Sequence, residues 1–473
     1  MEDLKMNEVE RKKILRVLSV MVLLNITLVL YLSYFQIFQA DKIKQNSYNK
    51  RLWANEDKVL RGSFYDRNKK ILVYSVKDEE EKINRIYKYD HLYSHIIGYS
   101  SREYGKAGLE KSYNSYLIDD GKFFDINGVK DLLDKESIGN DVILTIDHDM
   151  QLKTRELMLG KKGSIITMNP QTGEIYSMIS MPDFNVNTLK DDWPKIIDDT
   201  NSPLLNRAIQ GLYPPGSTFK IITALSSLQN NIINDDFLCS GSTTINGYTI
   251  RDYDSKSHGH VDLNKAFRVS CNTYFAEMAV QLGQSNILQT AEKFYFNKDF
   301  DFDLDIKKSS FPTDKMDKTE LAASGIGQGK ILATPLEMLM VASGIANDGN
   351  IVKPHLVSKV LTHDGILVKS NDIEIISNVG SYDKVEQIKN MMVEVVENGT
   401  GTQAKIDGIS VAGKTGTAEN ASGNNHAWFV GFAPAKDPKI AVVVLLEEEG
   451  STGGSKAAPI ARELIKFGLN NIK

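Results

Sequence analysis

The 473-residue chain has few cysteines and no excess of positive charge, two features that would otherwise indicate a class of protein. It has only two cysteines, so at most one disulfide can form, and it has no excess of positive charge, its net charge being −5. A small net charge on a surface of mixed signs argues against a nucleic-acid partner. We find no internal repeat and no long low-complexity linker. A charged fraction of 25% is that of an ordinary globular surface, and the length predicts two or three domains.

Charge is absent from residues 17–40, and residues 17–38 are mostly apolar. A helix of that length can cross a bilayer. Four basic residues lie between 11 and 16, so residues 1–16 are predicted to be a cytoplasmic tail. No clean small-residue cleavage site follows, which favours an uncleaved anchor over a signal peptide. We therefore predict a single-pass protein of the cell membrane, with its catalytic domain on the outer side.

Residues 39–139 lack any catalytic grouping. They are polar and rich in Lys, Asp, Glu and Tyr, and short β-like runs such as 70–74 stand among turn residues. We interpret this segment as a pedestal domain that holds the next domain away from the membrane.

From residue 140 the pattern changes to regular strands and helices. A strand at 142–146 is followed by a helix at 147–159, which Asp147 caps and Gly160 stops. Further strands are predicted at 164–168, 174–181, 409–418, 427–433 and 439–447, and a helix at 457–469. Strands at both ends flank a helical middle, which predicts an α+β domain over residues 140–473 whose sheet is closed by the C-terminal helix.

The most informative motif is Ser217-Thr218-Phe219-Lys220. A serine and a lysine three residues apart on a helix lie on the same face. The apolar run that follows buries the helix, and a desolvated lysine loses proton affinity and can act as a base. A serine nucleophile needs such a base because its hydroxyl is hardly ionised at neutral pH. Taken alone, this motif is more often an ordinary polar helix face.

Two more motifs follow in order. Ser270-Cys271-Asn272 begins 53 residues after Ser217, and Lys414-Thr415-Gly416-Thr417 begins 142 residues after Asn272. The three together resemble the motif set of serine β-lactamases and penicillin-binding proteins. Other segments are similar to those of the class B, single-activity transpeptidases among penicillin-binding proteins: 61–68 (with Phe64 in place of an isoleucine), 105–110, 206–208, 326–329, 334–336 and 427–434.

The resemblance implies a penicillin-recognising serine transpeptidase fold, an antiparallel sheet with flanking helices, with the pedestal and one transmembrane helix added. It implies peptidoglycan stem peptides ending in D-Ala-D-Ala as substrates and β-lactam antibiotics as ligands that acylate the serine. The implied partner of the transmembrane helix is a polytopic glycosyltransferase. No cofactor is required for the implied catalysis.

The resemblance also assigns roles to the motif residues. The implied catalytic residues include Ser217 as nucleophile, Lys220 as base and Ser270 as proton carrier. Asn272 is implied to bind both Lys220 and the substrate amide, and Lys414 to provide the positive charge that attracts the substrate carboxylate. The implied substrate-binding residues are Thr415, Gly416 and Thr417. The N–H groups of Ser217 and Thr417 are the expected oxyanion donors.

Other functions use the same motifs or the same fold. A β-lactamase would need a base that activates water, and no glutamate in a recognisable motif of that kind appears between Ser270 and Lys414. A D,D-carboxypeptidase is the closest chemical alternative, although those enzymes are usually simpler exported chains. The non-enzymatic alternatives are a β-lactam sensor, which needs a sizeable cytoplasmic domain, and a divisome or elongasome scaffold, which would usually have lost a motif residue.

The two cysteines, Cys239 and Cys271, are both expected to be reduced. Potential zinc ligands follow Cys239 within 21 residues, namely Asp252, Asp254, His258 and His260. Their spacing matches no standard zinc finger. Two interpretations remain: a structural zinc site close to the Ser270-Cys271-Asn272 turn, or a His258-Gly259-His260 loop that shapes the edge of the cleft without a metal.

Overall fold

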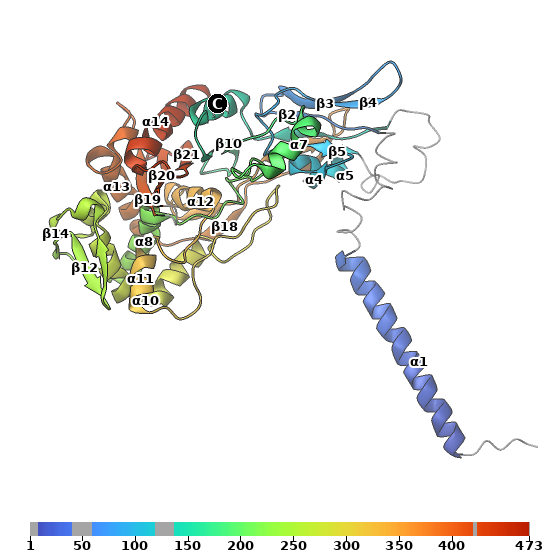
Figure 1. The fold of residues 1–473 in the computed structure, drawn as a ribbon, viewed down its shortest axis with the longest axis horizontal. Coiled ribbons are helices and arrows are strands. Elements are labelled where there is room, and N and C mark those ends of the chain that lie inside the picture. Colours follow the sequence, from blue (N-terminus) through green and yellow to red (C-terminus); the bar gives the residue numbers. More distant parts are fainter. Residues whose placement is uncertain (1–7, 40–58, 119–136, 420–422, 473) are drawn as a thin grey trace, which may run out of the picture.

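The computed structural model describes residues 8–39, 59–118, 137–419 and 423–472. Figure 1 shows a long N-terminal helix standing apart from a folded body that contains the pedestal and the larger α+β domain. The helix is α1 (Glu8–Tyr34), which continues as a short π-helix (Phe35–Gln39). Its large apolar side chains are exposed, and the stretch Arg11–Phe38 is long and apolar enough to cross a membrane. The predicted span at 17–38 therefore falls inside a helix of membrane length.

The α+β domain is built on a five-stranded antiparallel sheet. Its strand order is β10 (Ile175–Met181), β9 (Gly163–Met168), β21 (Ile440–Leu446), β20 (His426–Ala433) and β19 (Ala412–Ala418). Helices α6 (His148–Met158) and α14 (Gly453–Asn471) pack on one face, and the fully buried α12 (Pro335–Ala346) packs on the other (Figure 1). Every residue of β20 and β21 is buried as a result, and the side chains of Trp428 and Phe429 pack in the core of this sheet.

The sequence predictions for this sheet and for its two flanking terminal helices are confirmed, with ends shifted by up to four residues. Helix α6 begins as predicted. The Asp147 carboxylate accepts hydrogen bonds from the backbone N–H groups of Asp149 (3.1 Å) and Met150 (2.9 Å), as an N-cap does. Gly160, just after the helix, has a φ of +74°, which a glycine adopts without strain.

The middle of the chain is mostly helical. Its elements are α7 (Leu189–Asp198), α8 (Lys220–Asn230), α9 (Leu263–Val269), α10 (Asn272–Lys293), α11 (Lys318–Gly325) and α13 (Tyr382–Asn398), with 3-10 turns η3 (Gly216–Phe219), η4 (Tyr253–Ser255) and η5 (Thr402–Ala404). Small antiparallel pairs join β11 (Phe237–Cys239) to β14 (Gly259–Val261), β12 (Ser242–Ile245) to β13 (Tyr248–Arg251), and β15 (Asn350–Val352) to β18 (Ile375–Asn378).

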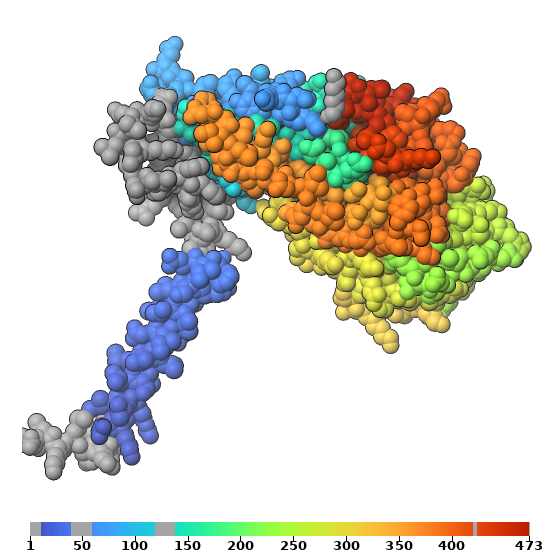
Figure 2. Space-filling view, turned by 180° about the vertical axis from the view of Figure 1, so that it is seen from behind, coloured from blue at the N-terminus to red at the C-terminus, as the bar shows by residue number. Residues whose placement is uncertain are grey.

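The pedestal contains a six-stranded sheet assembled from distant parts of the chain. Its order is β17 (Leu367–Ser370), β16 (Val357–Leu361), β8 (Asp141–Leu144), β2 (Phe64–Tyr65), β3 (Ile71–Lys77) and β4 (Ile83–Tyr87). In Figure 2 the orange surface of the returning segment lies beside the blue pedestal. This sheet takes strands from both sides of residue 140, and the domain boundary at 139 and 140 stays a prediction. The shorter elements are α4 (Gly108–Ser112), α5 (Asn114–Leu117), β1 (Val59–Leu60) with β7 (Ser137–Ile138), and β5 (Ser100–Ser101) with β6 (Gly105–Lys106).

A buried ion-pair network joins two of the family-like segments of the pedestal. Glu110 binds Arg61 through one carboxylate oxygen (2.6 Å) and Arg85 through the other (2.8 Å). Burial alone would raise the pKa of Glu110, but the two guanidinium groups outweigh it and hold that pKa below its ordinary value. Removing Glu110 would take this carboxylate from the buried Arg61 and the partly buried Arg85, so its loss should destabilise the pedestal.

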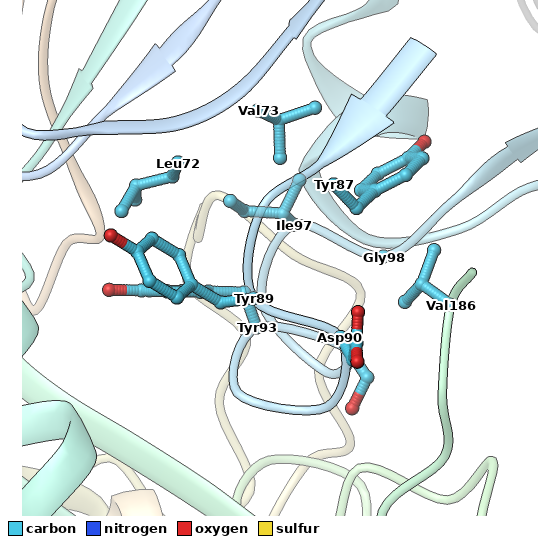
Figure 3. A pocket seen from close by; sticks show the side chains of 10 residues that line it. Leu72, Val73, Tyr87, Tyr89, Asp90, Tyr93, Ile97, Gly98 and Val186 are labelled. Atoms are coloured by element: carbon cyan, nitrogen blue, oxygen red, sulfur yellow. The ribbon is translucent and has the colours of Figure 1, made fainter.

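Two hollows in the described parts of the chain lie away from the three motifs. One is a gap of about 10 Å³ inside the pedestal, lined by apolar and tyrosine side chains such as Leu72, Tyr87 and Tyr93 (Figure 3), and it has room for about one water molecule. The other is a polar cleft of about 530 Å³ that is lined by Tyr113, Asp303 and residues 353–355 and 369–374. The residues of the three motifs line neither hollow.

Candidate active site

Ser217 lies in the 3-10 turn η3, immediately before α8, which begins at Lys220. The sequence predicted one helix over both residues; the 3-10 turn differs in detail but favours the same pairing, because residues i and i+3 eclipse at three residues per turn. The turn is fixed by the Thr218 hydroxyl, which donates to the carbonyl oxygen of Pro215 (2.6 Å). Ser217 is half-buried and Lys220 is fully buried.

The nucleophile turn is held against two other family-like segments. Gly216 has a φ of +54°, and a Cβ there would lie 2.7 Å from the carbonyl oxygen of Thr417. The Gly216 N–H donates to the carbonyl oxygen of Gly327 (2.9 Å), and a Cβ on Gly327 would lie 2.1 Å from the Gly216 oxygen. Both glycines are required for close backbone approach, so they set where Ser217 sits against β19.

The Lys220 ammonium group is surrounded by acceptors from the second motif. Its Nζ atom lies 2.7 Å from Asn272 Oδ1, 2.8 Å from the Ser270 carbonyl oxygen and 3.2 Å from Ser270 Oγ. Burial lowers the pKa of Lys220 to about 8, and the negative potential from Cys271 and Asp252 opposes that shift. A lysine with such a pKa is partly neutral near neutral pH and can accept a proton.

Ser270 connects the second motif to the third. Lys414 Nζ lies 3.0 Å from Ser270 Oγ, so one hydroxyl bridges the two lysines. Ser270 adopts a left-handed backbone (φ +60°), an uncommon conformation for a non-glycine residue that is often found at functional sites. Burial and the charge of Lys220 hold the pKa of Lys414 well below its ordinary value. All three motifs thus meet in one hydrogen-bonded network.

Asn272 is oriented from outside the motif. Its Nδ2 donates to the carbonyl oxygen of Arg251 (2.9 Å), and its backbone N–H donates to the Asp252 carboxylate. These contacts turn the Oδ1 atom toward Lys220. The other N–H of the Nδ2 group provides the donor that the expected contact with a substrate amide requires.

The third motif lies on β19, the edge strand of the five-stranded sheet. Alternation along the strand puts Lys414 and Gly416 on one face and Thr415 and Thr417 on the other. Gly416 was predicted only as a substrate-binding residue, and the structure shows that packing also requires a glycine at this position. A Cβ there would lie 2.9 Å from Thr218 Cγ2 and 3.1 Å from the Pro215 oxygen, so the glycine allows the strand to lie against the nucleophile turn.

A second cluster lies directly behind the Ser270-Cys271-Asn272 turn. The potential ligand atoms of Cys239, Asp252, His258 and Cys271 all lie within 4.8 Å of one another. Both thiols are free and buried. The structure therefore brings together three of the five predicted metal ligands and adds Cys271, which was not among the predicted ligands.

The other two predicted ligands point elsewhere. His260 Nδ1 lies 2.5 Å from Asp236 in an exposed pair, and Asp254 is exposed in η4 with a φ of +54°. Strand pairing explains this result. Cys239 pairs with Gly259 and His260 pairs with the exposed Leu238, so His260 falls on the outer face of the β11–β14 pair.

One supporting network was missed because none of its contacts is local in sequence. Glu447, just after β21, accepts from the Tyr213 hydroxyl (2.5 Å) and pairs with Arg207 (2.8 Å) and Lys162 (3.3 Å). Tyr213 also exchanges backbone hydrogen bonds with Ala333. The segment leading to Ser217 is thereby tied to the central sheet. The quoted Asn206-Arg207-Ala208 segment was the available signal, but nothing in the sequence identified Glu447 as its partner.

Comparison with known proteins identifies the family. A sequence profile described as the penicillin binding protein transpeptidase domain matches residues 163–466, and one described as the penicillin binding protein A dimerisation domain matches residues 61–142. The chain belongs to the penicillin-binding protein transpeptidase family. The predicted family and its α+β transpeptidase fold are confirmed.

Relatives within the family extend over nearly the whole chain. The peptidoglycan D,D-transpeptidase PbpA of Mycolicibacterium smegmatis is 32% identical over 490 residues, covering 96% of each chain. MrdA of Acinetobacter baumannii, also named a peptidoglycan D,D-transpeptidase, is 31% identical over 82% of this chain and 66% of its own length. The imipenem acyl-enzyme structure of penicillin-binding protein A from Mycobacterium tuberculosis aligns with a TM-score of 0.82 at 28% identity, over 88% of this chain and 99% of that one. These similarities support a class B, single-activity member.

Proposed function

We propose that this penicillin-binding protein is a membrane-anchored peptidoglycan D,D-transpeptidase with Ser217 as nucleophile and Lys220 as base. The observation that carries the proposal is the convergence of the three motifs on Ser270, whose hydroxyl lies 3.2 Å from Lys220 Nζ and 3.0 Å from Lys414 Nζ. The substrate is a stem peptide ending in D-Ala-D-Ala, and β-lactams acylate the same serine. Catalysis requires no cofactor, because nucleophile, base and proton carrier are all side chains of the chain.

In the first half-reaction Ser217 Oγ forms a bond to the carbonyl carbon of the penultimate D-alanine while its proton passes to Lys220 Nζ. The N–H groups of Ser217 and Thr417 stabilise the resulting oxyanion. The bond to the terminal D-alanine then breaks, and its nitrogen receives the proton from Lys220 through the Ser270 hydroxyl. The product is an acyl-enzyme and free D-alanine.

In the second half-reaction an amine of a neighbouring stem peptide attacks the acyl-enzyme carbonyl. Lys220 accepts a proton from this amine, the ester bond to Ser217 breaks, and the proton returns to Ser217 Oγ. A new peptide bond links the two stems. The edge position of β19 supports this scheme, since an edge strand leaves backbone groups free to pair with an extended peptide.

The test is release of D-alanine and formation of cross-linked dimers from a polymer with D-Ala-D-Ala stems, compared with a Ser217→Ala variant. Cross-linked product from the native chain alone supports the proposal. Release of D-alanine with only hydrolysed product would support the carboxypeptidase alternative instead.

The β-lactamase alternative needs a base that activates water beside the acyl-enzyme. Among the described residues, no carboxylate is hydrogen-bonded to Ser217, Lys220 or Ser270. Without such a base the penicilloyl ester is expected to persist. A sensor or scaffold is also disfavoured, because Lys220, Ser270, Asn272 and Lys414 are all present and form the hydrogen-bonded network described above.

We also propose that residues 1–16 lie in the cytoplasm, that the domain after α1 lies outside, and that α1 contacts a polytopic glycosyltransferase. The orientation is supported by four basic residues on one side of the span only. The contact is supported by the exposed apolar surface of α1 in the described structure.

A chain whose residues 17–38 are replaced by an unrelated apolar span with the same flanking charges tests both proposals. A C-terminal reporter that works only outside the membrane should stay active in both chains. Co-purification with glycosyltransferase activity should be lost only in the replaced chain. Cytoplasmic reporter activity would refute the orientation, and unchanged co-purification would refute the helix contact.

We further propose that Cys239, Asp252, His258 and Cys271 bind one structural zinc ion. Two thiols, an imidazole and a carboxylate are a suitable donor set for a closed four-ligand zinc site, and their atoms lie close enough to converge on one ion. Three of the four residues are buried, which fits a structural site rather than a catalytic one. Because Cys271 lies between Ser270 and Asn272, the ion would fix the turn that orients Lys220.

Elemental analysis of protein purified without added metal should give about one zinc ion per chain. Chelation should lower the Tm, because metal bound only to the folded state adds to folding stability. His258→Asn should lose the zinc, whereas the matched variant His260→Asn should keep it, since His260 faces Asp236. Zinc far below one per chain, together with an unchanged Tm on chelation, would leave only the metal-free loop.

A further inference from the structure

A hydroxyl outside the three motifs contacts the third motif directly. Thr400 Oγ1 lies 2.6 Å from Thr415 Oγ1, and either atom can be the donor. Thr400 belongs to the Gly399-Thr400-Gly401 turn between α13 and η5. Thr415 is only 6% exposed, and among the described residues Thr400 is the hydrogen-bond partner of its hydroxyl.

Three other elements hold the turn that carries Thr400. The N–H groups of Gly399 and Gly401 both donate to the carbonyl oxygen of Val395 at the end of α13 (3.1 and 2.9 Å). The Thr400 N–H donates to the Arg268 oxygen at the end of α9 (3.4 Å). At the start of α14, a Cβ on Gly454 would lie 2.4 Å from the Thr400 oxygen. The hydroxyl is therefore presented to Thr415 from a fixed backbone.

The direction of the hydrogen bond between Thr400 and Thr415 matters, because each hydroxyl has only one proton to donate. If Thr415 donates to Thr400, its proton is not available to a ligand. If Thr400 donates to Thr415, the Thr415 proton is free to turn toward the substrate. An incoming carboxylate is a stronger acceptor than a neutral hydroxyl, so its arrival favours the second arrangement. In this arrangement the hydrogen bond from Thr400 polarises the Thr415 hydroxyl, which strengthens the hydrogen bond from Thr415 to the carboxylate.

We propose that Thr400 is a positioning residue that donates to Thr415 Oγ1 and thereby aims the Thr415 hydroxyl at the terminal carboxylate of the substrate. This inference rests on the proposed role of Thr415 in holding that carboxylate. Thr400 then favours ligands that carry a carboxylate, whether stem peptides or penicillins, over uncharged analogues. It takes no part in the acyl transfer itself.

The experiment compares acylation by benzylpenicillin with acylation by its methyl ester, which lacks the charge. Thr400→Val keeps the shape of the side chain and removes the hydroxyl. We expect its second-order acylation constant to fall about tenfold for the acid and by less than about twofold for the ester. Thr400→Ser should restore the acid rate. Thr402→Val, an exposed residue of the same loop, should leave both rates unchanged.

A double-mutant cycle separates this role from general support of the loop. In a Thr415→Val background, Thr400→Val should have no further effect on the acid. An undiminished loss in that background, or an equal loss with the ester, would overturn the proposal.

If Thr415→Val alone acylates like the native chain, the assigned role of Thr415 fails first. If Thr415→Val is slow but Thr400→Val is not, only the role of Thr400 fails. Thermal unfolding of each variant, with Thr400→Ala as a second truncation, identifies any loss caused by misfolding.

Discussion

Replacing Ser217 by alanine is expected to abolish covalent labelling by penicillin. The ester between the drug and the chain requires an oxygen at this position, and the fully buried Lys220, which follows it within one turn, supplies the base that activates this oxygen. Any residual reaction should be slower by at least about 10⁴-fold, as for loss of a nucleophile in other serine enzymes. Intact-mass measurement of the native chain and the variant after incubation with benzylpenicillin gives the result directly.

The same experiment distinguishes the transpeptidase from a β-lactamase. The penicilloyl mass should persist on the native chain for many minutes, because no carboxylate of the described residues is hydrogen-bonded to Ser217, Lys220 or Ser270. Ser227→Ala is a suitable control: this buried serine of α8 donates to the Ala224 oxygen and faces none of the motifs, so labelling should be kept. Persistent labelling of the Ser217→Ala chain would show that another residue is the nucleophile, and rapid release of the drug from the native chain would favour the β-lactamase.

The parts of the site that follow from the sequence are those whose chemistry demands fixed residues at fixed spacing. A serine nucleophile needs a base within hydrogen-bonding reach, and a lysine one helical turn away can provide it, which is why Ser217 and Lys220 could be paired from the sequence. The second and third motifs, which follow the first in the expected order, indicated the family, and the family resemblance predicted the fold. Strands β9, β10, β20 and β21 were predictable because each is a short apolar run bounded by turn residues.

The parts that did not follow depend on contacts between distant segments. His260 looked like a metal ligand because it is close in sequence to Cys239, but the register of β11 and β14 turns it outward. Cys271 joins the cluster because the turn after α9 folds back over Asp252. Neither the outward position of His260 nor the inclusion of Cys271 follows from local sequence, because the spacing of residues along one strand does not fix its register with another strand.

The same limit applies to the pedestal and to Thr400. The six-stranded sheet combines residues 64–87, 141–144 and 357–370, and no local pattern in any one segment identifies the other two. Thr400 stands in a short glycine-containing turn that reads as a simple connection. Its hydroxyl becomes part of the site only because α9, α13 and α14 converge on that turn.

Lys220→Arg is expected to lower the acylation rate by about 10² or more, because it keeps the positive charge and removes the base. An arginine stays protonated at any working pH, so it cannot accept the Ser217 proton. Lys220→Met, which has neither charge nor base, should be impaired at least as strongly. Thermal unfolding of both variants separates loss of the base from loss of the fold, since the native side chain is fully buried.

The pH dependence of the acylation constant tests the role of Lys220 more directly. Burial lowers the pKa of Lys220 to about 8, and the neutral form is the one that accepts a proton. About a tenth of the lysine is then neutral at pH 7 and about nine-tenths at pH 9, so the acylation constant of the native chain should rise about tenfold over that range. The slow residual reaction of Lys220→Arg should show no such rise. A native profile that is flat from pH 6 to 9, or an arginine variant with the native profile, would mean that a different group takes the serine proton. Lys414, which is linked to Lys220 through the Ser270 hydroxyl, would be the next residue to test as the base.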